Sequence, residues 1–303
     1  MDREKTYSIE TLKTLEFSGT PLAVVGHPIQ HSISPAMHNA ALAKLGEADG
    51  RFKDWAYYRF DIHPEQLSEA LMLFHKHGFR GLNLTIPHKV QALDMIEDIS
   101  PEAQSMGAVN TLVWCETGYA GLNTDGYGLE RALEVDLGVV FKKATVMLLG
   151  SGGAARAAAV QAILSGCARL YISNRSPGRL RSLVDTLKPI AGGTTVKTFD
   201  LNRVPVDLPE SGVVINATAL GLQPGDPTPI DVGQLPEKWK VYDMIYNPAE
   251  TSLLKQAGAR GLEVANGLSM LVYQGARALE AWTHETVDAA IMMKAAHAAL
   301  KLS

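Results

Sequence analysis

The chain has little cysteine, no long apolar segment and no surplus of basic charge, and each shortage argues against a class of protein. Cys115 and Cys167 are its two cysteines among 303 residues, which is too few for a disulfide framework or a metal-ligand cluster, and a reducing compartment is the simple interpretation. No apolar run reaches the roughly 18 residues of a membrane span. The first twenty residues lack the apolar core of a signal peptide. We therefore expect a cytoplasmic protein with no metal site and no membrane partner.

The charge balance argues against a nucleic-acid partner. Lysine and arginine number 28 against 32 aspartate and glutamate, giving a formal net charge of −4, whereas nucleic-acid surfaces usually show a strong basic excess. The composition, 46% hydrophobic and 20% charged, is that of a soluble globular protein of about two domains. We expect a small molecule as the binding partner.

A strand–turn–helix pattern in the middle of the chain predicts a dinucleotide site. Residues 144–149 form an apolar run that stops at a glycine-rich turn, and an alanine-rich helix follows to about residue 164. In this turn Gly150 permits the sharp bend, Gly152 lets the backbone approach a pyrophosphate, and Ala155 is the small residue where the helix packs on the strand. A second apolar run follows at the spacing of a right-handed crossover. The predicted contacts of the turn are Gly150, Ser151, Gly152, Gly153 and Ala154.

The residues after that second apolar run favour NADP over NAD. An NAD-binding unit usually has Asp or Glu here, which binds a ribose hydroxyl. This chain has Asn174, Arg175 and Ser176, followed by Arg179, and no carboxylate among them. Arginine offers forked, charge-assisted donors to phosphate oxygens. The alternative, that both arginines are ordinary solvated side chains at the start of a helix, remains open.

Polar residues also gather around the expected strands of the first half of the chain. Ser34 before Pro35 predicts a helix N-cap with proline at the first helical position. That role does not explain Ser32, and two hydroxyls just after the carboxyl end of a strand are placed to bind a polar ligand at the edge of an α/β sheet. Asn83 and Thr85 alternate with apolar residues, so they share one face of a strand that Pro87 terminates.

Four further features complete the pattern. Lys89 follows the end of that strand, and Asn110 lies within an apolar segment, residues 107–113, that we expect to be a strand. Asp125 opens a helix, where a plain capping role is an equal alternative. From Leu268 we expect one helix to the end of the chain.

These blocks, in this order, resemble the shikimate dehydrogenase family. The resemblance rests on residues 32–35, 83–89, 107–111, 123–126, 150–154, 174–179, 216–218 and 242–246. It implies two α/β domains: a discontinuous N-terminal substrate domain, residues 1–124 plus 267–303, and a Rossmann-type NADP-binding domain, residues 125–266, with the active site in the cleft between. The first twenty residues lie outside the resemblance.

The resemblance also implies a reaction and a set of roles. The reaction is the reversible NADPH-dependent reduction of 3-dehydroshikimate to shikimate, in the pathway to aromatic amino acids. Lys89 and Asp125 are the implied catalytic pair, since a hydride that leaves an alcohol carbon requires the hydroxyl proton to leave too. Met244 and Gly267 would border the nicotinamide. The implied substrate contacts are Ser32, Ser34, Asn83, Thr85, Asn110, Tyr246 and Gln274.

Alternative functions remain at this stage. The first is a quinate/shikimate dehydrogenase with broader substrate or cofactor use, and the second is a catalytically silent relative that binds NADP. A glutamyl-tRNA reductase-like protein would need a nucleophilic cysteine, and neither Cys115 nor Cys167 lies in a suitable motif. The sequence leaves the choice between a monomer and a homodimer open.

Overall fold

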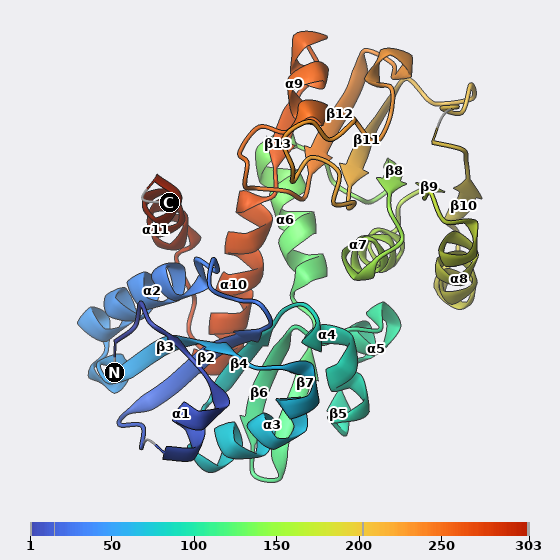
Figure 1. The fold of residues 1–303 in the computed structure, drawn as a ribbon. Coiled ribbons are helices and arrows are strands. Elements are labelled where there is room, and N and C mark those ends of the chain that lie inside the picture. The colour runs from blue at the N-terminus through green and yellow to red at the C-terminus, as the bar shows by residue number, and fades with distance from the viewer. Residues whose placement is uncertain (1, 15, 202, 302–303) are drawn as a thin grey trace. The chain divides into compact units, whose positions relative to one another are not determined.

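The computed structural model describes residues 2–14, 16–201 and 203–301, and its chain divides into two compact units (Figure 1). The first, called here the terminal unit, comprises Met1–Thr124 and Val272–Ser303. The second, the central unit, comprises Asp125–Leu271. The predicted fold class, two α/β domains of which the first is discontinuous, is confirmed. The second change of unit falls inside one helix, α10 (Leu268–Thr283).

The terminal unit is a seven-stranded mixed sheet in the order β1-β3-β2-β4-β6-β7-β5. Its first four strands in that order run parallel, and β6 pairs antiparallel with both β4 and β7. The strands are β1 (Thr6–Tyr7), β2 (Thr20–Gly26), β3 (Trp55–Asp61), β4 (Gly81–Leu84), β5 (Asp98–Ile99), β6 (Thr111–Cys115) and β7 (Gly118–Leu122). The helices are α1 (Ile9–Thr14), α2 (Ser34–Ala48), α3 (Leu67–Lys76), α4 (His88–Gln91), α5 (Pro101–Met106), the later part of α10, and α11 (Ala289–Lys301).

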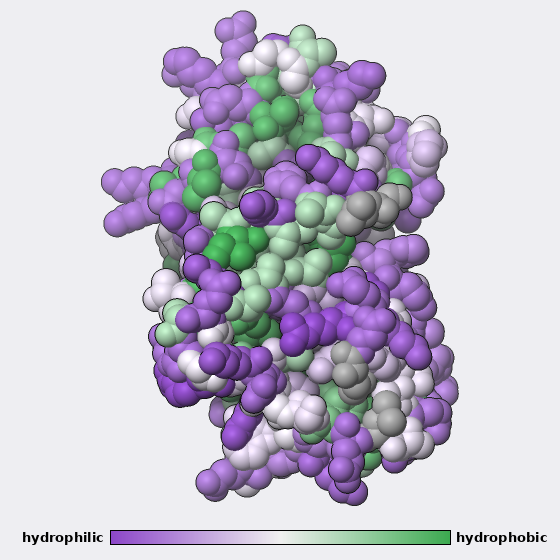
Figure 2. Space-filling view, turned by 90° about the vertical axis from the view of Figure 1, so that its left-hand side faces the viewer, coloured by the Kyte–Doolittle hydropathy of each residue, from purple (hydrophilic) through white to green (hydrophobic). Residues whose placement is uncertain are grey.

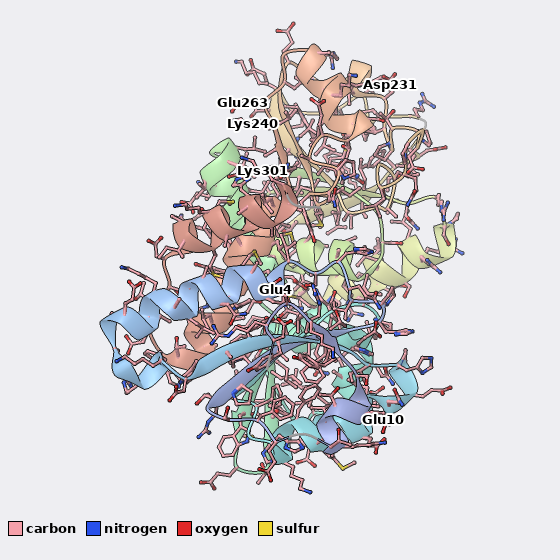
Figure 3. All side chains as sticks on the ribbon, turned by 60° about the vertical axis from the view of Figure 1, so that its left-hand side comes forward. Glu4, Glu10, Asp231, Lys240, Glu263 and Lys301 are labelled. Atoms are coloured by element: carbon pink, nitrogen blue, oxygen red, sulfur yellow. The ribbon has the colours of Figure 1, made fainter. Side chains whose placement is uncertain are left out.

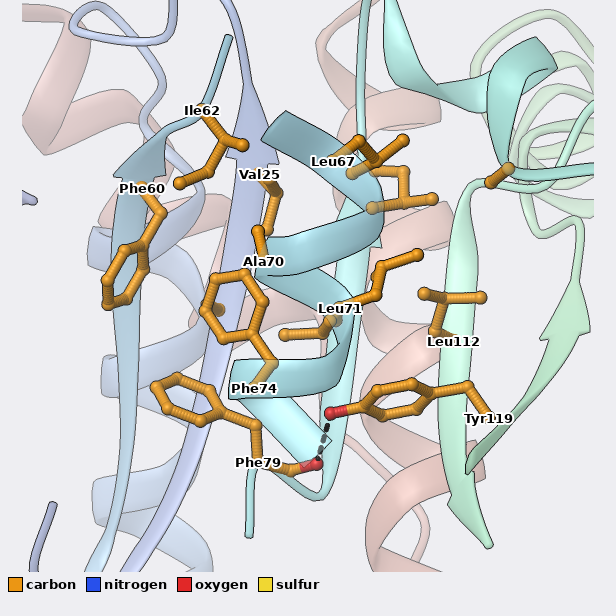
Figure 4. Close-up of a cluster of buried hydrophobic side chains, with 14 of the residues drawn as sticks. Val25, Phe60, Ile62, Leu67, Ala70, Leu71, Phe74, Phe79, Leu112 and Tyr119 are labelled. Carbon is orange, nitrogen blue, oxygen red and sulfur yellow. Dashed lines mark hydrogen bonds between the residues drawn. The ribbon is translucent and has the colours of Figure 1, made fainter. Parts of the chain in front are cut away.

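Strand β3 has one apolar face and one polar face, because successive side chains of a strand point to opposite sides. Tyr58 and Phe60 lie in a large buried cluster together with side chains of α3 (Figure 4). Within it Phe74 packs edge-on against Phe60 and Phe79, with ring centroids 4.9 and 4.8 Å apart. Each such ring, once buried, stabilises the fold by roughly 1.5–3 kcal/mol. The opposite face of β3 carries Tyr57, Arg59 and Asp61.

The central unit is a six-stranded parallel sheet in the order β10-β9-β8-β11-β12-β13. If β8, the first strand of this unit in the chain, is numbered 1 and β13 is numbered 6, the order in the sheet is 3-2-1-4-5-6. This is the strand order of a dinucleotide-binding fold. Its strands are β8 (Thr145–Leu149), β9 (Arg169–Ser173), β10 (Thr195–Thr198), β11 (Ser211–Asn216), β12 (Lys238–Asp243) and β13 (Val264–Asn266). Its helices are α6 (Asp125–Leu137), α7 (Gly153–Leu164), α8 (Pro177–Leu187), α9 (Ser252–Ala259) and the start of α10. An ion pair of 3.0 Å links Lys240 on β12 to Glu263 beside β13 (Figure 3).

Four local predictions are wrong. Helix α2 begins at Ser34 and has Ile33 at its N-cap position without a side-chain cap, so Ser34 is not the cap. The expected single C-terminal helix is two helices, because His284 adopts a positive φ of 58° after α10 and breaks the helical path before α11. Two residues expected within strands lie just outside them: Asn110 precedes β6, and Thr85 follows β4.

The exposed surface in Figure 2 is mostly hydrophilic, with hydrophobic residues gathered in smaller areas. Within the described ranges, no helix is both long enough and apolar enough to cross a membrane. Across these same residues, no group of three or more histidine, cysteine or acidic side chains could hold a metal ion.

His38 of α2 is a buried histidine that stays neutral. Its ring stacks on Tyr57 with centroids 4.1 Å apart and planes 1° from parallel. Among the described residues, neither ring nitrogen has a hydrogen-bond partner. Burial lowers the pKa of His38 to about 3, whereas a histidine in an unfolded chain takes up a proton near pH 6.5.

The unfolded chain therefore binds one more proton than the folded protein between pH 6.5 and pH 3. The stability that a neutral His38 provides is fully present above pH 6.5 and is lost as the pH falls below it. Between pH 7 and pH 5 the wild-type free energy of unfolding should fall by about 2 kcal/mol more than that of His38→Leu. Urea unfolding at both pH values measures this difference. The exposed His297→Leu serves as control and should keep the wild-type pH dependence; a His38→Leu variant that also keeps it would contradict the buried, neutral state.

Candidate functional site

In the terminal unit, three of the predicted substrate residues lie in one buried hydrogen-bond network. The Asn110 amide donates to the Thr124 hydroxyl at 3.0 Å and to Gln274 Oε1 at 3.3 Å. The Asn83 amide donates to the Asn110 carbonyl oxygen at 3.2 Å. Gln274 comes from α10, so the network joins the two sequence segments of this unit.

Sequence reasoning missed three members of this network. The Tyr57 hydroxyl donates to Asn83 Oδ1 at 2.7 Å, and Thr111 Oγ1 accepts from Asn83 Nδ2 at 3.2 Å. Thr124 donates its backbone N–H to Asn110 Oδ1 at 2.8 Å. Thr111 and Thr124 stand inside the blocks that carry the family resemblance, which was the available signal. The sequence contained no signal for Tyr57, because nothing distinguishes it from its neighbour Tyr58, whose side chain lies in the apolar cluster.

These contacts fix the orientation of Asn83. Both hydrogens of its Nδ2 are used within the protein, and Oδ1 keeps one free lone pair after accepting from Tyr57. At 6% exposure, an Asn amide with its donors occupied can offer a ligand one acceptor and no donor. Asn110 is also held firmly: its Nδ2 donates to Thr124 and Gln274, and its Oδ1 accepts the Thr111 hydroxyl and the Thr124 N–H.

Ser32 and Ser34 lie where the loop after β2 enters α2. The Ser32 hydroxyl oxygen accepts the backbone N–H of Ser34 at 3.4 Å. The N-cap residue of the 15-residue α2, Ile33, provides no side-chain cap, and the helix dipole makes this end of α2 positive. Two hydroxyls beside such a helix end suit a carboxylate.

Lys89 follows β4 on the short helix α4. Its backbone carbonyl accepts the N–H of Val109 at 2.8 Å, and the Thr85 carbonyl accepts the N–H of His88 at 2.8 Å. The His88 imidazole is fully buried and donates through Nε2 to the Ile62 carbonyl at 2.9 Å. Burial lowers the pKa of His88, so it anchors this turn as a neutral ring.

The glycine turn of the central unit has room for a phosphate group. Gly150 has φ +117°, and a Cβ there would lie 2.9 Å from the carbonyl oxygen of Ala217. A Cβ at Gly152 or Gly153 would meet no atom within 4 Å, and α7 begins there without a side-chain cap. Ser151 is half-buried, and Ala154 is exposed beside it. The open backbone N–H groups of this turn fit a pyrophosphate at a helix N-terminus.

The end of β9 fits a phosphorylated ribose. Arg175 and Arg179 are exposed, and Asn174 Nδ2 donates to the Ser176 carbonyl at 3.1 Å, which fixes the turn before α8. Residues 173–184 contain no aspartate or glutamate that would repel a phosphate. This donor set suits NADP.

Met244 and Gly267 are brought into contact at the ends of β12 and β13. A Cβ at Gly267 would lie 2.0 Å from the Met244 carbonyl oxygen, so only glycine fits. The fully buried Asp243 holds this segment: it accepts from Asn216 Nδ2 at 3.0 Å, from the N–H of Ile245 at 3.1 Å and from the Thr251 hydroxyl at 2.7 Å. Sequence reasoning gave Asp243 no role.

The predicted site residues are divided between the two units. Ser32, Ser34, Asn83, Thr85, Lys89, Asn110 and Gln274 belong to the terminal unit. Asp125, Tyr246 and all the predicted cofactor contacts belong to the central unit. Burial raises the pKa of Tyr246, so its hydroxyl stays protonated at neutral pH.

Comparison with known proteins decides the family. A model of the shikimate dehydrogenase substrate binding domain matches residues 24–112, and one of the shikimate 5'-dehydrogenase C-terminal domain matches residues 267–297. The shikimate dehydrogenase (NADP(+)) of Symbiobacterium thermophilum is 41% identical over 93% of this chain and 95% of its own. This chain belongs to the shikimate dehydrogenase family.

Solved relatives of this shikimate dehydrogenase family member share its fold. The Thermus thermophilus shikimate 5-dehydrogenase, in complex with NADP(H) and shikimate, is 35% identical with a TM-score of 0.79, covering 92% of this chain and 99% of that one. A quinate dehydrogenase from Corynebacterium glutamicum in complex with NAD is 32% identical with a TM-score of 0.80, covering 92% and 99%.

The Asp243 network gives a stability prediction. Asp243→Asn keeps the shape of the side chain but replaces one acceptor oxygen with an NH₂ group that faces donors. The free energy of unfolding should fall by about 1.5–3 kcal/mol, the usual size of a hydrogen bond to a charged group. Urea unfolding measures it. Asp231→Asn, an exposed carboxylate that also accepts a backbone N–H, should lose less than about 1 kcal/mol; equal losses in the two variants would refute the anchoring role.

Proposed function

We propose that this chain catalyses the reversible NADPH-dependent reduction of 3-dehydroshikimate to shikimate, a step of aromatic amino acid biosynthesis. The observation that carries the proposal is the joint presence of two donor sets in a member of this family. One is the serine pair with the Asn110–Gln274 network, and the other is the glycine turn with its two arginines. The first suits a polyhydroxylated acid and the second suits NADP.

The substrate would be held through its carboxylate and its ring hydroxyls. Ser32 and Ser34 would bind the carboxylate as neutral donors beside the N-terminal end of α2, with Tyr246 assisting. Amides and hydroxyls can both donate and accept, which matches the ring hydroxyls of the acid. The residues proposed to read those hydroxyls are Asn83, Thr85, Asn110 and Gln274, of which Asn83 would serve as an acceptor only.

The cofactor would be held by the central unit. Gly150, Ser151, Gly152, Gly153 and Ala154 would bind the pyrophosphate through the turn and the start of α7. Arg175 and Arg179 would bind the ribose phosphate on the turn that Asn174 and Ser176 shape. Met244 and Gly267 would border the nicotinamide. When bound, NADPH supplies the hydride.

Lys89 and Asp125 would manage the proton of the reacting hydroxyl. As the ketone becomes an alcohol, Lys89 would give its ammonium proton to the oxygen, and in the reverse direction the neutral amine would take that proton back. Asp125 would accept a hydrogen bond from the same hydroxyl and orient the lysine. The retention of both residues argues against a catalytically silent relative.

Two further assignments belong to this proposal. We infer a cytoplasmic enzyme, supported by the free thiols of Cys115 and Cys167, which suit a reducing compartment. We infer a monomer or a homodimer that takes small molecules as its partners. Quinate with NAD is the second candidate chemistry, favoured by the quinate dehydrogenase among the solved relatives, whereas the arginine pair after β9 favours NADP.

The test follows absorbance at the NADPH band after shikimate and NADP are added to the wild type and to Lys89→Ala. The wild type should reduce NADP, and the variant should be slower by at least about 100-fold, because a positioned general acid–base group usually contributes that much. The exposed Lys76→Ala, in the same unit, is the matched control and should keep the wild-type rate.

Parallel reactions with quinate and with NAD separate the alternatives. Turnover of quinate without shikimate would overturn the substrate assignment, and equal rates with NAD and NADP would overturn the role of the arginines. No turnover with either acid would leave the catalytically silent relative as the function.

A further inference from the structure

Arg59 links the loop between β2 and α2, which carries Ser32, to a part of the chain that the family resemblance does not cover. From the polar face of β3, its guanidinium donates to the Ser32 carbonyl oxygen at 2.7 Å. It also donates to the Thr6 hydroxyl at 2.8 Å and to the Glu4 carbonyl oxygen at 2.6 Å (Glu4 is labelled in Figure 3). One planar group therefore holds three neutral acceptors, two of them in the N-terminal segment, defined here as residues 2–14.

The N-terminal segment is built into the terminal unit. Its strand β1 pairs in parallel with β3, with Thr6 opposite Arg59. Tyr7, Ile9 and Leu12 are 7%, 3% and 0% exposed, so the segment is fixed by burial in the core. Because the core fixes the positions of Thr6 and Glu4, the hydrogen bonds to these two residues also fix the position of the Arg59 guanidinium.

The Ser32 carbonyl belongs to the first of the two peptide links between the paired serines. Ser32 also donates its backbone N–H to the Ile29 carbonyl at 3.0 Å, and its hydroxyl accepts from the Ser34 N–H. The same face of β3 holds the start of this loop as well. There Asp61 binds His27 Nδ1 and Gln30 Nε2, each at 2.6 Å.

We propose that Arg59 is a positioning residue for the substrate carboxylate, braced by the N-terminal segment. The bond to the Ser32 carbonyl fixes the rotation of that peptide, and with it the direction of the Ser32 hydroxyl relative to the first turn of α2. The N-terminal segment thus acts on substrate affinity through a single arginine. This inference rests on the proposed function, in which Ser32 and Ser34 bind the carboxylate.

The test compares Michaelis constants in full-length variants. Arg59→Met keeps the side-chain stem and removes the donors; it should raise KM for shikimate about tenfold, as expected for a lost charge-assisted hydrogen bond. Its kcat and its KM for NADP should stay within about threefold of wild type, since uniform binding alone is affected. Arg59→Lys should recover part of the loss. Thr6→Val should raise KM for shikimate by about two- to threefold, because it removes one of the three hydrogen bonds of the guanidinium and leaves the bond to the Ser32 carbonyl in place.

The matched control is Arg80→Met, in the same unit, whose guanidinium lies over the Trp114 ring at 4.4 Å from its centroid. It should leave KM for shikimate unchanged. A double-mutant cycle adds the mechanism: if Arg59 acts through Ser32, then in a Ser32→Ala background Arg59→Met should raise KM by less than about threefold.

Four outcomes would overturn the inference. The first is an Arg59→Met variant with the same KM for shikimate as Arg80→Met. The second is an Arg59→Met variant that loses kcat together with affinity for both ligands. In both cases the proposed function would still hold as long as the wild type turns over shikimate. Full additivity with Ser32→Ala would also overturn the inference. A wild type without shikimate turnover would overturn the inference and the proposed function together.

Discussion

The alternation of side chains along β3 is the constraint on which the terminal unit depends. One face of this strand is committed to the buried cluster with α3, which fixes its register, because a slip of one residue would expose Phe60 and bury Arg59. With the register fixed, the opposite face presents Tyr57, Arg59 and Asp61. Each of them bonds to a different part of the proposed substrate site: Asn83, Ser32, and the loop residues His27 and Gln30. Burial of one face of β3 in the apolar core thereby fixes the positions of the three polar side chains on its other face.

The central unit follows a second constraint, the close approach of backbone segments at the carboxyl ends of its strands. Gly150 must pass Ala217, and Gly267 must pass Met244, at distances that no side chain permits. The first of these contacts, between the ends of β8 and β11, lies where the strand order of a doubly wound sheet reverses and opens a crevice for a ligand. Asp243 supports this region by occupying three donors that would otherwise be buried without partners.

Local sequence patterns predicted the central unit well. The apolar runs around Gly150 and the helix to Leu164 follow from strand and helix periodicity. The ribose-phosphate role of the arginines after β9 comes from their chemistry and stays a prediction. The polar groups at the ends of β2 and β4 were also visible, because they interrupt apolar runs. Each of these signals is contained in a short stretch of sequence, of about 11–18 residues, over which periodicity and turn chemistry are informative.

Two kinds of feature could not be predicted from the sequence. The first is contacts between residues far apart in the chain, and the second is backbone conformations at residues that do not usually adopt them. Asn110 and Gln274 are 164 residues apart, and Thr6 and Arg59 are 53 apart. The break before α11 occurs at a histidine with positive φ, where a glycine would have been the expected signal. The error at Ser34 has a related cause: the hydroxyl that accepts a backbone N–H at the start of α2 belongs to Ser32.

The most direct test of the proposed function is a crystal structure of the wild-type protein with shikimate and NADP bound. The carboxylate of shikimate should lie within hydrogen-bond distance, about 2.6–3.0 Å, of the Ser32 and Ser34 hydroxyls. The hydroxyl that is oxidised should lie beside Lys89 Nζ. A carboxylate bound away from the serine pair, or a ring with no hydroxyl within reach of Lys89, would contradict the proposed function.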